Sequence, residues 1–269
     1  MKKKLIIVLL IILLLLIITF FFNKWFIAHN IKVIEYGITD KKLPDDYHGL
    51  KIVHFSDILY GKSTNINDVK KTVKKINELN PDIVVFTGDL FTKDIKVSEK
   101  EKTKIKNELS RINAKIEKFA ILGDNDKHFK DKFYTVFKDD FIILDNEIYE
   151  LYNGSEELIK IIGINDIKKE DESLKEDTSY KIVLLHKPDE IKKLKNNYNI
   201  VLSGHSMGGQ IKIPFYGSLI KLKGAKTYVS GYYDVNNTKL YVNDGIGSQN
   251  VNMRINNRPK INFYRIYSK

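Results

Sequence analysis

Three stretches decide the fold of this chain, namely KIVHFSDILYG (Lys51–Gly61), IVVFTGDLF (Ile83–Phe91) and FAILGDND (Phe119–Asp126). Each begins with a short apolar run typical of a buried strand and places an aspartate just behind it. Between the first two, apolar residues at helical spacing predict a helix that Asn80-Pro81 ends, with the stripe Val69, Val73, Ile76 and Leu79. A charged helix is expected over Val97–Lys115. Strands that alternate with helices predict parallel pairing.

The second half is richer in strands. Ile182–Leu185 and Ile200–Ser203 are short apolar runs that lead into LLHKPD (Leu184–Asp189) and SGHSMGGQ (Ser203–Gln210). Lys168–Thr178 is charged and is expected to form an exposed loop. Further strands are expected over Ile31–Tyr36, Ile142–Leu144, Ile148–Leu151, Leu158–Ile164, Thr227–Tyr233 and Lys239–Val242, with turns at Asn153-Gly154 and Asn236-Asn237.

The N-terminus predicts a membrane anchor. Lys2, Lys3 and Lys4 precede an apolar run over Leu5–Phe22, which as a helix is about 27 Å long and so matches a bilayer core. A signal peptide has a similar start, but bulky aromatic residues stand here where a cleavage site needs small ones. We therefore expect a cytoplasmic start over residues 1–4, an uncleaved transmembrane anchor over 5–26, and one domain over 31–269. The three early lysines outweigh Lys24, which predicts a single-pass protein of the cell membrane with the domain outside the cytoplasm.

The formal charge of +11 does not by itself indicate nucleic-acid binding. The lysines mostly alternate with acids, as on solvated helix faces, and no zinc finger, RNP motif or Arg-rich arm is present. No nucleic-acid partner is expected. The chain contains no cysteine, which excludes disulfides and Cys metal sites.

Five segments in fixed order carry a family resemblance: FSDILYG, TGDLF, LGDND, LLHKPD and SGHSMGGQ. They resemble the calcineurin-like metallophosphoesterase family, whose pattern reads D-x-H, G-D, G-N-H-D/E, H and G-H-x-H. The closing YVNDGIG (Tyr241–Gly247) and Asn257-Arg258-Pro259 are similar to the membrane-anchored bacterial YkuE-type branch. The resemblance implies an α/β fold in which two sheets form a β-sandwich flanked by helices, a four-layer α/β/β/α arrangement preceded here by one transmembrane helix.

The resemblance also implies two metal sites, one of which has lost ligands. The family's first site corresponds to Asp57, Leu59, Asp89 and Met207, so two of four ligand positions are apolar. Its second site corresponds to Asp89, Asp124, His186 and His205, all of which can coordinate. Asn125 occupies the position of the family's catalytic histidine, and an amide cannot act as a general acid. The catalytic residue therefore stays unknown, and one divalent transition metal (Mn, Fe or Zn) is expected rather than two.

Two functions follow from this pattern. The first is a membrane-anchored, metal-dependent phosphoesterase-family hydrolase that acts on a phosphodiester or phosphomonoester, such as a phospholipid or another phosphate-bearing envelope substrate. The second is a catalytically inactive relative that binds a partner or has a structural role in the envelope.

Each candidate residue also has a simpler reading. Asp57 and Asp89 could be turn residues, Asp124 a helix cap, and His186 a buried histidine with satisfied hydrogen bonds. His54 lies inside a strand and is expected to pack in the core. His128 is expected on the surface, although its place after LGDND would also allow it to replace the lost histidine.

Overall fold

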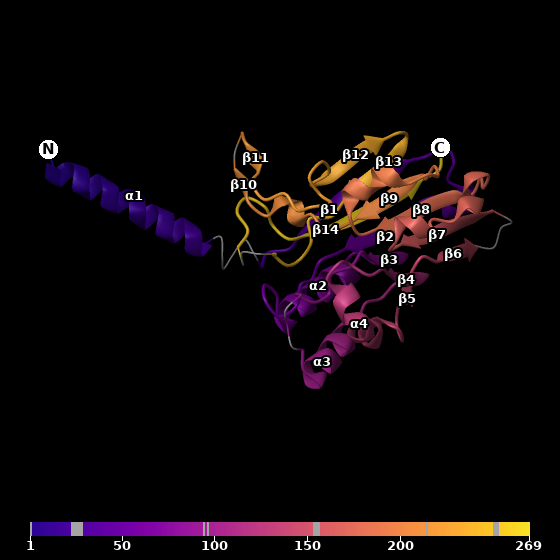
Figure 1. Ribbon diagram of the computed structural model, residues 1–269, viewed down its shortest axis with the longest axis horizontal. Coiled ribbons are helices and arrows are strands. Elements are labelled where there is room, and N and C mark those ends of the chain that lie inside the picture. The colour runs from indigo at the N-terminus through magenta and orange to yellow at the C-terminus, as the bar shows by residue number, and fades with distance from the viewer. Residues whose placement is uncertain are drawn as a thin grey trace.

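Two six-stranded sheets pack face to face, and α-helices cover the outer face of the first sheet (Figure 1). The computed structural model describes residues 2–22, 29–93, 95, 97–152, 157–213, 215–249 and 253–269. The expected turn at Asn153-Gly154 lies outside these residues.

The first sheet has the order β1-β14-β2-β3-β4-β5. Its strands β2, β3, β4 and β5 are mutually parallel, as the alternation of strands and helices predicts. β14 runs antiparallel to β2 and parallel to β1, so the last strand of the chain separates the first two. The bounds are β1 Lys32–Thr39, β2 Leu50–Phe55, β3 Ile83–Phe86, β4 Glu117–Ala120, β5 Ile142–Ile143 and β14 Lys260–Tyr267.

The second sheet has the order β12-β13-β9-β8-β7-β6. Its inner strands β13, β9, β8 and β7 are parallel, and an antiparallel strand closes each edge. Asn236 and Asn237, both with positive φ, form the predicted turn between β12 and β13. The bounds are β6 Ile148–Tyr152, β7 Leu158–Ile164, β8 Tyr180–Leu185, β9 Ile200–Ser203, β12 Gly231–Val235 and β13 Thr238–Val242. A separate small hairpin pairs β10 (Lys212–Ile213) with β11 (Gly217–Ser218).

Three helices lie below the first sheet in Figure 1: α2 (Ile66–Glu78), α3 (Glu99–Leu109) and α4 (Lys130–Phe137). A capping box starts α2, where Asn65 and Asp68 each bond the other's backbone N–H, and it buries the predicted face of Val69, Val73 and Ile76. A second capping box at Ser98 starts α3, which ends at Leu109 and is shorter than predicted.

Short 3-10 helices complete the chain. They lie over Asp45–Tyr47, Asp126–Phe129 (η3), Ile167–Lys169 (η4), Glu172–Lys175 (η5), Pro188–Lys193 (η6) and Met207–Gly209 (η7). The segment Lys168–Thr178, expected to be a loop, therefore contains helical turns, and Leu174 within it is buried. Among the described residues, η5 and η6 pack on the outer face of the second sheet through Leu174 and Ile191.

Three apolar layers result. One lies between the first sheet and α2–α4 and contains Phe55, Phe86 and Phe137; a second lies between the two sheets and contains Ile83 and Ile182. The third covers the outer face of the second sheet. With two central sheets buried on both faces, the strand ends are the parts of the sheets where polar side chains can gather.

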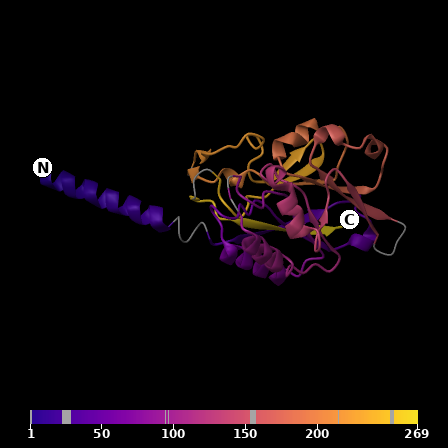
Figure 2. The ribbon, with the colours of Figure 1, turned by 60° about the horizontal axis from the view of Figure 1, so that its bottom comes forward.

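The N-terminal helix α1 spans Lys2–Phe22 and is long and apolar enough to cross a membrane. Its apolar side chains are exposed to solvent rather than packed on the domain. Figure 2 shows it extending away from the sandwich. This finding is consistent with an anchor and with a signal sequence.

Candidate metal centre

Five strands of the two sheets bring the predicted site residues to one edge of the sandwich. Asp57, Asp89 and Asp124 follow β2, β3 and β4 of the first sheet. His186 and His205 follow β8 and β9 of the second. β2, β3 and β4 are parallel to one another, and so are β8 and β9. All five residues therefore follow the carboxyl end of a strand. The site therefore forms across the two sheets.

The loops that hold these residues adopt unusual backbone conformations. Asp57, Asp89 and His205 have φ of 51°, 61° and 65°, in the left-handed region that non-glycine residues rarely occupy. At Gly204 a Cβ atom would lie 2.7 Å from Asp57 Oδ2, so only glycine fits between the second sheet and this carboxylate. Strained positions of this kind concentrate at functional sites.

Asp89, His186 and His205 form a compact cluster whose ligand atoms all lie within 4.8 Å of one another. His186 Nδ1 lies 2.7 Å from the backbone oxygen of Thr87, and His205 Nε2 lies 2.9 Å from that of Lys223. Each ring therefore donates one N–H to a carbonyl. The remaining nitrogens, His186 Nε2 and His205 Nδ1, face each other at 3.2 Å, with Asp89 Oδ2 at 3.5 Å from the former.

This arrangement fits a metal cation. In two neutral imidazoles so oriented, both facing nitrogens carry lone pairs, which repel each other unless a proton or a metal lies between them. Histidine ligands usually donate their second N–H to a carbonyl or carboxylate, as both do here. Burial and a mixed nitrogen and carboxylate donor set are consistent with Mn, Fe or Zn.

The electrostatics of the two histidines differ. Burial alone would lower the pKa of His186, but the carboxylates of Asp89 and Asp57 outweigh it and raise the pKa to about 10. Burial and the charge of His186 lower the pKa of His205 to about 4. Without a metal, one proton therefore lies at His186 and His205 is neutral. The carboxylates of Asp89 and Asp57 therefore favour a positive charge at the cluster.

Asp57 lies beside the cluster. Its Oδ2 accepts hydrogen bonds from Ser56 Oγ at 2.5 Å and from the backbone N–H of His205 at 2.9 Å. Its Oδ1 is buried and has no hydrogen-bond partner among the described residues. Burial, together with the charge of Asp89, raises the pKa of Asp57 to about 7 even though His186 opposes the shift. An unpartnered buried oxygen in this position is available to a cation.

Asp124 is held by a lysine rather than by the cluster. Its Oδ2 lies 2.8 Å from Lys187 Nζ, the residue directly after His186. Burial would raise the pKa of Asp124, but the bond to Lys187 and the charge of His186 lower it. Asp124 does not cap η3, whose N-cap is Asn125 without a side-chain bond. The extra negative charge of Asp124 is thus balanced by an adjacent cation.

Comparison with protein families matches residues 50–209 to calcineurin-like phosphoesterases. The chain belongs to this family. It is 29% identical over 264 residues to the uncharacterized metallophosphoesterase YkuE of Bacillus subtilis (strain 168), covering 92% of this chain and 89% of the relative. These two findings confirm the predicted family, the YkuE-type resemblance and the metallophosphoesterase fold. Members of the family use divalent metals, and Asp89, His186 and His205 lie within the matched residues.

Two further relatives are described as UDP-2,3-diacylglucosamine pyrophosphatase LpxG. The protein of Chlamydia muridarum (strain MoPn / Nigg) is 28% identical over 289 residues, covering 83% of this chain and 87% of the relative. That of Chlamydia trachomatis serovar D is 30% identical over 261 residues, covering 74% of this chain and 78% of the relative.

Leu59 and Met207, two positions that depart from the family pattern, have the left-handed backbone conformation found at other site residues. Leu59 and Met207 have φ of 50° and 51°, a left-handed conformation that costs a residue with a Cβ about 1–2 kcal/mol. Both side chains are buried. Met207 Sδ lies 4.0 Å from Nη2 of Arg254, a buried guanidinium that also bonds the carbonyls of Asp244 and Gly247. Leu59 and Met207 thus have the same left-handed backbone conformation as Asp57, Asp89 and His205, although their side chains are apolar.

Asn125 does not face the cluster as a free group. Its backbone N–H donates to Asp89 Oδ1 at 2.8 Å, and its side-chain Nδ2 donates to Asp89 Oδ2 at 3.2 Å. The amide therefore orients the Asp89 carboxylate. This contact agrees with the absence of a general acid at this position.

Sequence reasoning assigned no role to Asp126, which holds the two loops together. Its carboxylate accepts hydrogen bonds from the backbone N–H groups of Gly123, Asp89 and Leu90 at 2.9, 2.7 and 2.9 Å. The only signal in the sequence is its fixed place at the end of LGDND. The predictions for His54 and His128 are confirmed, since His54 is buried with its pKa lowered to about 3 by desolvation, and His128 is exposed.

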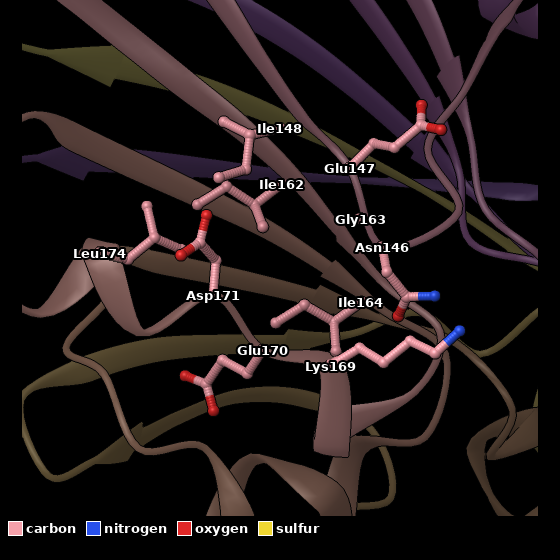
Figure 3. Close-up of a pocket in the computed structure, with 10 residues that line it drawn as sticks. All are labelled: Asn146, Glu147, Ile148, Ile162, Gly163, Ile164, Lys169, Glu170, Asp171 and Leu174. Carbon is pink, nitrogen blue, oxygen red and sulfur yellow. The ribbon is translucent and has the colours of Figure 1, made fainter.

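A cavity of about 540 Å³ adjoins the centre. Its wall contains His205, three acidic residues and three lysines. Lys187 pairs with Asp124 and Lys193 with Glu190; the other two charged residues of the wall are Asp189 and Lys223. A smaller cavity of about 290 Å³ lies along β6 and β7, where Figure 3 shows Glu170 and Lys169 beside the apolar Ile164. None of the predicted ligands lines this second cavity.

Proposed function

We propose that this protein is a membrane-anchored phosphoesterase that works with one divalent transition metal. Asp89, His186 and His205 would hold the ion, and Asp57 and Asp124 would be the further ligands nearest to it. The observation that carries the proposal is the facing pair of imidazole nitrogens, each fixed by a backbone carbonyl on its other side. Leu59 and Met207 stand at two of the four positions that correspond to the family's first metal site, and both side chains are apolar and buried, which favours one ion.

A divalent ion in such a site supplies charge for a phosphoryl oxygen and activates water for attack on phosphorus. The rest of the chemistry comes from the chain. Lys223, an exposed lysine in the wall of the cavity, would attract and orient an anionic phosphate. Asn125 would keep the Asp89 carboxylate in its orientation.

The substrate we propose is a phosphate ester or pyrophosphate carried by a lipid. Support comes from the two relatives described as pyrophosphatases of a diacylated sugar nucleotide, and from the apolar helix α1. In this proposal α1 anchors the protein in the cell membrane with the domain over 31–269 outside the cytoplasm. The lipid bilayer and an envelope lipid with a phosphate group are then its partners.

A second candidate function is binding without turnover. Three positions of the family's site carry side chains that cannot replace the originals, namely Leu59, Asn125 and Met207. Asn125 is also occupied by its hydrogen bonds to Asp89. A protein that binds a metal and a phosphate group but does not hydrolyse it would keep the same cluster.

Metal content and hydrolysis measured on the full chain in detergent distinguish these functions. We expect about one equivalent of Mn, Fe or Zn by elemental analysis, and metal-dependent hydrolysis of bis-p-nitrophenyl phosphate. His205→Ala should abolish both. His48→Ala is the matched control, because it removes an exposed imidazole that precedes β2, at the opposite end of this strand from Asp57, and it should change neither.

The outcomes separate the hypotheses. One equivalent of metal without hydrolysis of any phosphoester would support the binding protein. The absence of metal from a folded preparation reconstituted with each ion would overturn both. If Asp57→Asn removed the ion and His205→Ala did not, the ion would occupy the first site and the assignment would be wrong.

A further inference from the structure

The chain between His205 and Lys223 carries an exposed apolar hairpin. β10 and β11 pair antiparallel, and Ile213 is opposite Gly217. Phe215 is fully exposed, Tyr216 is 75% exposed, and Leu219 is 53% exposed. Apolar side chains gathered at the tip of a projecting element indicate a surface that contacts another phase or molecule.

Phe215 is also strained. Its φ of 65° lies in the left-handed region, where a bulky aromatic residue is an outlier and asparagine or glycine would fit more easily. The strain is not compensated by packing on the described domain, because the ring is fully exposed. A bulky aromatic ring that is both strained and exposed points to a contact outside the domain.

The hairpin lies next to the point where the chain enters the domain. Lys212 donates its backbone N–H to the oxygen of Ile255 at 2.9 Å, and Asn256 Nδ2 donates to the oxygen of Lys212 at 3.2 Å. On the same segment, Arg258 Nε donates to the oxygen of Asn30 at 2.9 Å. Figures 1 and 2 both show the hairpin at the end of the domain nearest α1, with β6 at the opposite end.

The tether limits how far this end can move from a membrane. From Phe22, at the end of α1, to Asn30, the chain can span at most about 28 Å when fully extended. If α1 crosses a bilayer, the entry point and the neighbouring hairpin are therefore held close to its surface. The opposite end of the domain is not restrained in this way.

The charge of the same segment suits a membrane with anionic head groups. Residues 206–233 contain Lys212, Lys221, Lys223 and Lys226 and no aspartate or glutamate. Of these, Lys221, Lys223 and Lys226 are exposed. Clustered lysines beside exposed aromatic residues are typical of segments that bind anionic lipid surfaces.

The segment that carries the hairpin, residues 206–233, also contacts the metal centre. The backbone oxygen of Lys223 accepts the hydrogen bond from His205 Nε2. Leu222, Lys223 and Gly224 line the cavity beside His205. The segment that ends in the exposed apolar tip therefore also forms one wall of that cavity.

We propose that the β10–β11 hairpin is a second membrane contact. Its apolar tip rests in the head-group region of the lipid bilayer, and the cavity beside His205 is thereby presented to phosphate groups at the lipid surface. The proposal rests on the proposed anchoring and deepens the proposed function, because it specifies a lipid head group as the source of the phosphate.

Single-cysteine labelling of the full chain tests the contact directly, since the natural sequence has no cysteine. Phe215→Cys carries an environment-sensitive fluorophore in proteoliposomes of phosphatidylcholine and phosphatidylglycerol, with and without spin-labelled quencher lipids. Tyr152→Cys is the matched control, because Tyr152 is an aromatic residue that is 58% exposed on β6 at the far end. We expect at least twofold quenching at position 215 and none at position 152.

The alternative results overturn the hairpin contact. An unquenched label at position 215 means that the tip lies in water. Equal quenching at both positions means that the whole domain lies along the bilayer. A label at position 215 that is shielded from water but insensitive to quencher lipids means that another protein, such as a second copy of the chain, covers the tip.

A kinetic measurement connects the contact to the metal centre. Phe215→Asn with Tyr216→Ser removes the apolar tip and relieves the strained φ, so the domain should fold. We expect about tenfold slower hydrolysis of a phosphate-bearing lipid in vesicles, with unchanged hydrolysis of soluble bis-p-nitrophenyl phosphate. Equal rates on vesicle lipid would overturn the role in substrate access. Quenching at position 215 in a protein without hydrolysis would leave the contact standing and remove the proposed activity.

Discussion

At the scale of single residues, Lys187 competes with a metal for Asp124. Its ammonium group lies 2.8 Å from Asp124 Oδ2 and follows His186 directly. Lys187 occupies the Asp124 carboxylate, and its positive charge repels a cation at the cluster. Both effects disfavour metal binding. The pair also explains how a carboxylate can stand at a position where the family resemblance implies an amide.

We predict that Lys187→Gln increases Mn²⁺ affinity about tenfold, because it frees the Asp124 carboxylate and removes a like charge. Titration calorimetry on the full chain in detergent measures the change. Adding Asp124→Asn to Lys187→Gln should cancel most of the gain. An unchanged or weaker affinity in Lys187→Gln would mean that Asp124 is not a ligand.

The raised pKa of His186 sets the direction of the pH dependence. The carboxylates of Asp89 and Asp57 outweigh burial and hold that pKa at about 10, so at neutral pH a metal must displace a proton. The lowered pKa of His205, about 4, means that this ring releases none. We predict that Mn²⁺ affinity rises up to tenfold per pH unit between pH 7 and 9, measured by the electron paramagnetic resonance of free Mn²⁺. A flat profile would contradict the assignment of His186 as a ligand.

The sequence identified the ligand candidates because their residue types can be compared with a family pattern one by one. Asp89, His186 and His205 do come together in the structure. The pairing of Asp124 with Lys187 and the bonds from Asn125 to Asp89 could not be predicted. They depend on how loops approach each other, across the two sheets for Asp124 and Lys187 and between β3 and β4 of the first sheet for Asn125 and Asp89, which no local spacing specifies.

At the scale of elements, Asp126 joins the loop after β3 to the loop after β4. Its carboxylate is fully buried and accepts three backbone hydrogen bonds, so its removal leaves three buried donors without partners. We predict that Asp126→Ala lowers the free energy of unfolding by about 3 kcal/mol or more, measured by urea denaturation in mild detergent. It should also weaken metal binding, because Asp89 lies on the loop that loses its support.

Glu176→Ala is the control for this change. Glu176 is exposed, and its replacement should alter stability by no more than about 0.5 kcal/mol. Asp126→Asn should lie between the two, since one oxygen remains to accept. A loss below 1 kcal/mol in Asp126→Ala would mean that the two loops are held by other contacts.

The strands and helices show where local patterns suffice. The apolar runs predicted β2, β3, β8 and β9 to within about one or two residues, and the stripe of Val69, Val73 and Ile76 predicted α2. The position of β14 between β1 and β2 could not be predicted, because it pairs residues more than 200 positions apart. The 3-10 turns over Lys168–Thr178 were missed because the charged composition of this segment hides the buried apolar side chain of Leu174.

At the scale of the whole molecule, helix α1 and the β10–β11 hairpin lie at one end and the sandwich extends from them (Figure 1). If both contact the membrane, the domain has a fixed face toward the lipid, and the cavity beside His205 opens near that face. The arrangement would limit the substrates to those that lie at the bilayer surface. The side of the membrane on which the domain lies then determines which lipids can reach the cavity.

The last prediction concerns that side. Lys2, Lys3 and Lys4 are the first residues of α1 and outnumber Lys24 after it, so the positive-inside rule places the N-terminus in the cytoplasm and the domain outside. In intact cells, a membrane-impermeant maleimide should label Tyr152→Cys fully, because this position is exposed on β6. Lys3→Cys should be labelled only after the cells are permeabilised, and the natural chain, which has no cysteine, gives the background. Labelling of Lys3→Cys alone in intact cells would place the domain in the cytoplasm. Hydrolysis would then be confined to lipids of the inner leaflet, and the metal would come from the cytoplasmic pool.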